Sequence, residues 1–155
     1  MKLTTFTDYS LRVLIYLAAQ PERRATIGEI ARSFAISESH LTKVVHFLGK
    51  HGWLANVRGK GGGLGLGRPP QEIGLGAVVR QTEGGDLPAE CFDTEHSDCS
   101  IARICKLRFA LRRAVDAFYA ELDRYTLEDL VHNRTALSKV LLIKDVSARA
   151  DSRAA

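Results

Sequence analysis

Residues 26–48 read TIGEIARSFAISESHLTKVVHFL, and this stretch decides the fold. Its apolar residues recur at steps of three and four over 27–34 and again over 41–48. That spacing predicts two short helices, each with one buried face, and Thr26 stands where it can cap the first of them. Because only residues 35–37 separate the two patterns, the stretch predicts a helix-turn-helix.

The residues on either side predict a further helix and a wing. Residues 11–18 repeat the same apolar spacing and end before Pro21, so we expect a helix ahead of the helix-turn-helix. After it, Trp53–Arg58 reads as a strand, Gly59–Gly63 is rich in glycine, and Leu64–Arg68 reads as a second strand. Strand, glycine-rich turn and strand predict a β-hairpin, which in this position is the wing of a winged helix-turn-helix.

The second half of the chain predicts helices suited to pairing. Residues 73–79 indicate a short helix that ends at Gly84-Gly85. From Ile101 to Tyr125 the apolar residues step by three and four, with Arg108 interrupting the series, which predicts one long helix with a narrow apolar seam. The chain offers few helices to cover that seam, so a homodimer built across it is expected. The sequence Thr126–Asp129 indicates a capping box that opens one more short helix.

The expected fold class is therefore mainly α with a small β wing. We expect a winged helix-turn-helix DNA-binding domain over 1–82, a cysteine loop with a long dimerisation helix over 83–145, and a polar, disordered tail over 146–155. Charge divides the chain in a similar way. Residues 1–81 carry 11 Lys and Arg against 5 Asp and Glu, a net +6, whereas residues 82–155 carry 11 against 13, a net −2. The basic front half indicates a polyanionic partner, here double-stranded DNA.

The polar face of the second helix of the helix-turn-helix and the wing supply the candidate DNA contacts. Such a helix lies in the major groove, where serine, threonine, histidine and lysine side chains reach phosphates or base edges. The candidates are Ser37, Ser39, His40, Thr42, Lys43 and His46 on the helix, and Arg58, Lys60 and Arg68 on the wing.

All three cysteines of the chain, Cys91, Cys99 and Cys105, lie in one acidic segment with the spacing C-x7-C-x5-C. Thiolates bind soft metals, and an iron–sulfur cluster usually takes four ligands, so three cysteines leave one position open. An odd number of cysteines argues against a disulfide framework. Asp8 and Arg12 interrupt any apolar signal sequence, and no apolar run is long enough to span a bilayer, so we expect a cytoplasmic protein without membrane contact.

Three motifs together resemble the IscR-like family of winged-helix regulators. They are Leu3-Thr4-x-x-Thr7-Asp8-Tyr9-x-Leu11-Arg12, the wing Val57-Arg58-Gly59-Lys60-Gly61-Gly62-Gly63-Leu64, and the three cysteines ahead of a long helix. The motif Phe118-x-x-Glu121-Leu122-Asp123-x-Tyr125-Thr126-Leu127 is similar to that of the nitric-oxide-sensitive repressors of this family. The resemblance covers about residues 1–143.

The resemblance implies a dimeric repressor with one iron–sulfur cluster per subunit, either 2Fe–2S or 4Fe–4S. In such proteins nitric oxide nitrosylates the cluster and the repressor leaves its operator. Cys91, Cys99 and Cys105 match the ligating cysteines, and Asp8 stands where some members supply a fourth ligand from the partner subunit; His96 is a local rival. The chain departs from the family in its longer first cysteine gap and in Gly65, where the wing often carries arginine.

Other classes of function stay open at this point. Two of the cysteines could form a switchable disulfide in a thiol-based redox regulator, or the chain could sense iron–sulfur status. An enzyme is not expected. The glycine-rich segment is no P-loop, because Lys60 is followed by glycine, and neither a Ser/His/Asp constellation nor a pair of catalytic carboxylates is evident.

Overall fold

The computed structural model describes residues 2–59, 61–84, 89, 92, 99–101 and 103–141. The helices and strands are, in chain order, α1 (Thr5–Ala19), α2 (Ile27–Phe34), α3 (Glu38–Lys50), β1 (Leu54–Val57), β2 (Gly63–Leu66), the 3-10 helix η1 (Pro70–Glu72), α4 (Leu75–Glu83), α5 (Lys106–Leu122) and α6 (Leu127–Leu130). Residues 134–141 are also helical. β1 and β2 pair antiparallel as a two-stranded sheet. The predicted class, mainly α with a small β wing, is confirmed.

The helix-turn-helix forms as its spacing predicts. Thr26 caps α2 through a capping box, in which its hydroxyl accepts from the Glu29 amide while the Glu29 carboxylate accepts from the Thr26 amide. Ala35 then takes a left-handed conformation, with φ of 55°, which ends α2 and turns the chain. The regularly spaced apolar residues of α3, which are Leu41, Val44, Val45 and Leu48, are buried, so its other face is turned to solvent.

One apolar core joins the front of the chain to its end. Leu14, Ile30, Leu41 and Leu48 contribute fully buried side chains from α1, α2 and α3. The same core takes in residues from beyond α5, namely Leu127, Val131 and Leu141. Residues 127–141 therefore pack with the helix-turn-helix, and α5 lies between two segments of chain that are both fixed to this core.

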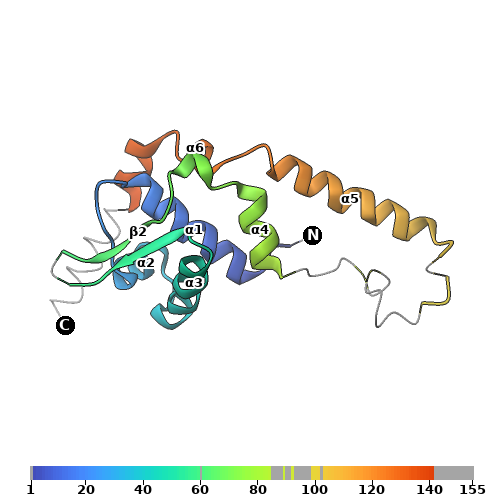
Figure 1. The fold of residues 1–155 in the computed structure, drawn as a ribbon, viewed down its shortest axis with the longest axis horizontal. Helices are drawn as coiled ribbons and strands as arrows, with labels where there is room; N and C mark the ends of the chain where they lie inside the picture. The colour runs from blue at the N-terminus through green and yellow to red at the C-terminus, as the bar shows by residue number, and fades with distance from the viewer. Residues whose placement is uncertain are drawn as a thin grey trace.

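The long helix is shorter than the sequence predicts. It begins at Lys106 and not at Ile101, because Cys105 has an extended backbone and acts as the N-cap, its Sγ accepting from the Arg108 amide at 3.5 Å. Ile101 and Ile104 lie in a turn before it, and Tyr125 follows its end. Figure 1 shows α5 reaching away from α1–α4. None of its side chains is buried within the single chain.

Several sequence-based expectations fall outside the described residues. These are the placement of Lys60, Cys91 and His96, and that of the predicted tail over 146–155. The helix that precedes the cysteines is described, and it ends as predicted. α4 stops at Gly84, whose φ of 63° is the left-handed cap for which glycine is favoured.

Candidate functional site

The solvent face of α3 carries every DNA-contacting candidate predicted for that helix. Ser37, which is its N-cap, and Ser39, His40, Thr42, Lys43 and His46 are all exposed. Thr42 donates its hydroxyl to the Glu38 carbonyl at 2.8 Å, and the Ser37 and Ser39 hydroxyls lie 3.3 Å apart. Lysine, histidine and hydroxyl groups are therefore presented together along one exposed helix face, which suits phosphate and base-edge contacts.

Aromatic contacts fix α3 between α1 and the wing. Phe47 on α3 packs edge-on against Phe6 of α1 with ring centroids 5.2 Å apart. On its other side, His51 lies 4.2 Å from the Phe47 ring and 5.1 Å from Trp53, which precedes β1. Nδ1 of His51 also lies 3.0 Å from the Phe47 carbonyl oxygen. These ring contacts therefore link α1 to α3 and to the residue that precedes β1 of the wing.

The wing candidates occupy different environments. Arg58 is exposed at the end of β1. Arg68, although exposed, donates from Nε to the Gly52 carbonyl at 3.1 Å and from Nη2 to the His51 carbonyl at 3.2 Å. Arg68 therefore fastens the chain after β2 to the turn before β1, and the atoms of its guanidinium group that face solvent are held at a fixed place beside the wing.

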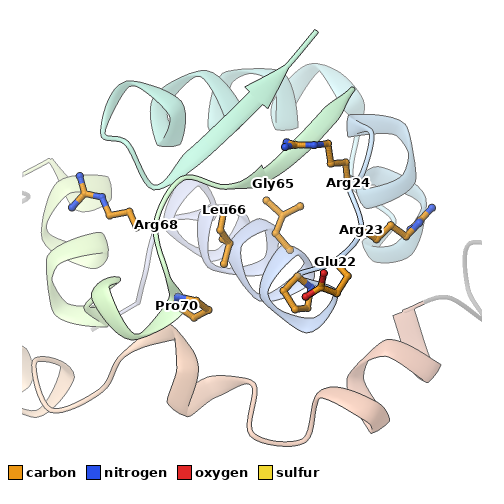
Figure 2. A pocket seen from close by; sticks show the side chains of 9 residues that line it. Glu22, Arg23, Arg24, Gly65, Leu66, Arg68 and Pro70 are labelled. Atoms are coloured by element: carbon orange, nitrogen blue, oxygen red, sulfur yellow. The ribbon is translucent and has the colours of Figure 1, made fainter. Parts of the chain in front are cut away.

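The structure brings one further arginine to the wing that sequence reasoning missed. Ala25 pairs with Leu64 of β2 through two main-chain hydrogen bonds, of 3.0 and 2.7 Å, and this places Arg24 beside the wing. Arg24, Arg68, Gly65 and Leu66 line part of a hollow of about 320 Å³ between β2 and the end of α1 (Figure 2). The sequence separation of Ala25 and Leu64 explains why no local pattern pointed to Arg24.

Two of the three candidate metal-ligating cysteines are described. Cys99 is exposed, and Cys105 is half-buried at the N-cap of α5, where its sulfur accepts from the Arg108 amide. Cys91 and the rival ligand His96 lie outside the described residues. Among the residues that the structure describes, no group of three His, Cys, Asp or Glu side chains is placed to hold a metal ion.

Asp8 lies in the first turn of α1, away from the described cysteines along the chain. Its carboxylate accepts from the Arg12 guanidinium at 3.0 and 2.8 Å, an ion pair across one helical turn. The Asp8 side chain is 44% exposed and that of Arg12 is 41% exposed. Such a surface pair contributes little to stability, so the Asp8 carboxylate stays accessible to a group from outside its own chain.

A buried hydroxyl network joins the first turn of α1 to the last turn of α4. Thr7 donates its hydroxyl to that of Thr82 at 2.9 Å, and both residues are buried. The amide of Thr4, the N-cap of α1, donates to the Glu83 carboxylate at 2.9 Å. Burial acts to raise the pKa of Glu83, but the nearby Thr7 hydroxyl and the hydrogen bonds from the Thr4 amide and hydroxyl outweigh it and lower that pKa. The turn that carries Asp8 is thereby fastened to the helix that leads into the cysteine segment.

The apolar side chains on and before α5 are unusually exposed for a single chain. Ile104 is 83% exposed and Leu107 is 65% exposed. The seam positions Leu111, Val115 and Phe118 are only partly buried. Within the described residues, no helix combines the length and the apolar character needed to cross a bilayer.

Comparison with known proteins agrees with this geometry. The family model Rrf2, described as an iron-dependent transcriptional regulator, matches residues 3–133. The HTH-type transcriptional regulator NsrR of Bacillus subtilis is 47% identical over 94% of this chain and 100% of its own length. NsrR of Geobacillus kaustophilus is 46% identical over 91% of this chain and 97% of its own length.

Two solved structures share the fold. CymR, the global cysteine regulator of B. subtilis, superimposes with a TM-score of 0.64 at 33% identity, over 84% of this chain and 95% of that one. IscR of T. potens superimposes with a TM-score of 0.68 at 26% identity, over 86% of this chain and 88% of that one. The resemblance stated from the sequence motifs is confirmed by these relatives.

Proposed function

This chain belongs to the Rrf2 family of transcriptional regulators, and from that premise we propose that it is a nitric-oxide-sensing repressor, which binds operator DNA as a homodimer while it carries an iron–sulfur cluster. The observation that carries the proposal is the exposed polar face of α3 beside a wing, in a chain whose relatives are NsrR regulators. The protein acts as a DNA-binding regulator in the cytoplasm and not as an enzyme.

The DNA-binding step uses α3 and the wing. α3 enters the major groove, and Lys43 with its exposed neighbours contacts phosphates and base edges. Arg58, at the end of β1, enters the adjacent groove with the turn of the wing. In a two-fold dimer the two copies of α3 read half-sites about one helical turn apart. Net charge favours this arrangement, because the excess of basic residues lies in 1–81.

Cys91, Cys99 and Cys105 would hold the cluster, with Asp8 of the other subunit as the fourth ligand. The donor set fits, because three thiolates and one carboxylate suit iron, because the Cys105 sulfur sits at a helix N-terminus, and because the Asp8 carboxylate is only weakly engaged by Arg12. When bound, the cluster supplies iron that reacts with nitric oxide. The protein's part is to hold the cluster and to convert its loss into a movement of α1.

The dimer forms across α5. The helix buries none of its side chains within one chain, and its seam is apolar at steps of three and four. A second copy of the same helix covers such a seam by knobs-into-holes packing. An Asp8 ligand from the partner requires that the dimer bring Cys99 and Cys105 of one subunit toward α1 of the other.

Signal transmission follows from the contacts of α1. Asp8 follows Thr7, whose hydroxyl is fastened to Thr82, and Phe6 packs on Phe47 of α3. If Asp8 ligated a cluster, loss of that group would free the first turn of α1, and the contact of Phe6 with Phe47 would pass the change to α3. The spacing of the two recognition helices would change, and the dimer would no longer match its two half-sites.

The test uses the anaerobically purified holo dimer and a duplex selected from random-sequence DNA by the wild-type protein. We expect visible absorption, protection of a partly palindromic site, and a steep loss of affinity with salt. Lys43→Ala and Arg58→Ala should weaken binding, whereas Arg124→Ala, far from α3 in sequence, should not. Added nitric oxide should bleach the protein and release the DNA.

Two outcomes contradict the proposal. A colourless protein that binds DNA until its thiols are oxidised would be a thiol-based redox regulator. If nitric oxide bleaches the cluster while the DNA affinity stays unchanged, the cofactor is assigned correctly but the sensing mechanism is wrong.

A further inference from the structure

Arg24 lies against the part of the outer wing face that belongs to β2, where glycines leave no side chains. Gly63 and Gly65 are two residues apart on β2 and so point to the same face of the hairpin. Leu64, between them, points to the opposite face and is 3% exposed in the core. The glycine face is therefore the outer one, and its cross-strand partners are Val57 and Ala55 of β1.

Distances show that the Arg24 side chain uses the space that these two glycines leave. A Cβ atom placed on Gly63 would lie 3.1 Å from Cβ of Arg24, and one placed on Gly65 would lie 3.4 Å from its Nη1. The side chain thus runs along the outer face from Gly63 to Gly65 and delivers its guanidinium group beside Gly65.

The two neighbouring arginines have different surroundings. Arg23 forms an ion pair with Glu29, the carboxylate of the α2 capping box, and in Figure 2 it points away from β2. Arg24 reaches toward β2 in the same view and is exposed. Within the described part of the chain, the Arg24 side chain has no hydrogen bond or ion pair, so no neighbouring carboxylate neutralises its charge.

We propose that Arg24 binds a phosphate group of the DNA backbone at the side of the wing. The inference rests on the proposed DNA-binding function and adds a residue to it. A wing that enters a groove by its turn places its flanks against the phosphates that border the groove. A guanidinium group is the side chain best shaped to grip a phosphate by two parallel hydrogen bonds.

The experiment measures affinity for the selected duplex as a function of salt. Because each phosphate contact adds about 0.9 to the slope of log affinity against log salt, Arg24→Ala should lower the slope by about one unit and weaken binding about eightfold near 0.1 M salt. Arg24→Lys should recover part of the loss, since it keeps the charge without the planar fork. Arg124→Ala removes an exposed arginine elsewhere and should leave both quantities unchanged.

A rescue variant tests the position and not merely the charge. In the double variant Arg24→Ala with Gly65→Arg, the strand itself supplies the cation beside the same surface, and the slope should return to the wild-type value. An unchanged slope and affinity in Arg24→Ala would overturn the inference, and so would an equal loss in Arg124→Ala. If Lys43→Ala and Arg58→Ala still weaken binding in that case, the proposed function stands and only the role of Arg24 fails. If the wild-type protein selects no duplex, the proposed function itself fails.

Discussion

Arg80 on α4 donates from Nη1 and Nη2 to the two carboxylate oxygens of Asp123, each at 2.6 Å, at the end of α5. The Arg80 guanidinium also lies 4.5 Å from the centre of the Tyr119 ring. Gly76 makes this approach possible, because a Cβ atom there would lie 2.0 Å from Oδ1 of Asp123. These hydrogen bonds lower the pKa of Asp123. The contact sets the direction in which α5 leaves the body of the protein.

Breaking that contact should affect DNA binding more than folding. Both side chains are nearly half exposed, so the pair contributes little to the free energy of unfolding. In Arg80→Ala we expect an almost unchanged thermal midpoint but weaker operator binding, because the two recognition helices lose their fixed separation. Arg124→Ala is the matched control, since its ion pair with Glu121 spans only three residues. If Arg80→Ala and Arg124→Ala bind the operator with equal affinity, Arg80 does not orient α5.

Replacing any one of Cys91, Cys99 or Cys105 with alanine should give a folded, colourless dimer. Three thiolates are needed to hold the cluster, whereas the described cysteines, Cys99 and Cys105, contribute no buried core side chain. The measurements are iron and sulfide content, visible absorption and native mass. A variant that keeps a full cluster would take that cysteine out of the ligand set, and loss of the dimer in all three would make the segment structural.

Asp8→Ala should leave the dimer and all three thiols intact but shorten the lifetime of the cluster in air at least about tenfold, as loss of a supporting ligand does. Arg12→Gln is the matched control, because it breaks the same ion pair and keeps the carboxylate; its cluster should be as long-lived as the wild type. His96→Ala should have a mild effect. If His96→Ala loses the cluster while Asp8→Ala keeps it unchanged, the fourth ligand is His96.

Leu111→Glu should weaken the dimer roughly 100-fold, because it places a charge in the apolar seam at the centre of the interface. Ala120→Glu adds the same group to the same helix at an exposed position nine residues on, which lies on the opposite side of the helix, and should leave the dimer intact. Sedimentation across a range of concentrations measures both. Equal dissociation of the two variants would show that the interface does not follow the seam.

Acid should destabilise the protein in part through Glu29. Burial acts to raise the pKa of Glu29, but the hydrogen bond from the Thr26 amide and the charge of Arg23 outweigh it and hold that pKa below the ordinary 4.5. The ionised carboxylate therefore stabilises the fold above pH 4.5, and this contribution is lost as the pH falls through the lower, folded-state pKa.

The variant Glu29→Gln tests this assignment. It should lose about 1 kcal/mol of unfolding free energy at neutral pH, because glutamine keeps the capping box but loses the charge and the ion pair with Arg23. It should also show a flatter loss of stability below pH 4.5 than the wild type. Chemical denaturation at several pH values checks both, and parallel pH profiles for the two proteins would contradict the assignment.

The helix-turn-helix and the wing could be predicted because their signals are local. The apolar positions of α2 and α3 share a face whenever the chain is helical, and the Thr26–Glu29 capping box and the Gly84 stop each act within a few residues. The Asp8–Arg12 ion pair also has a local signal in the sequence, since charges four residues apart face each other on a helix. The start of α5 was predicted five residues early, because apolar spacing does not reveal which residue caps a helix.

Contacts between distant segments were decided only by the tertiary structure. Arg24 comes to the wing through the pairing of Ala25 with Leu64, and Thr7 meets Thr82 across α1 and α4. No periodic pattern in the sequence indicates either contact, because each depends on how whole helices and strands pack and not on the spacing of neighbours along the chain. A sequence determines which face of each element is apolar; which polar groups then meet is decided when those apolar faces are buried together in one core.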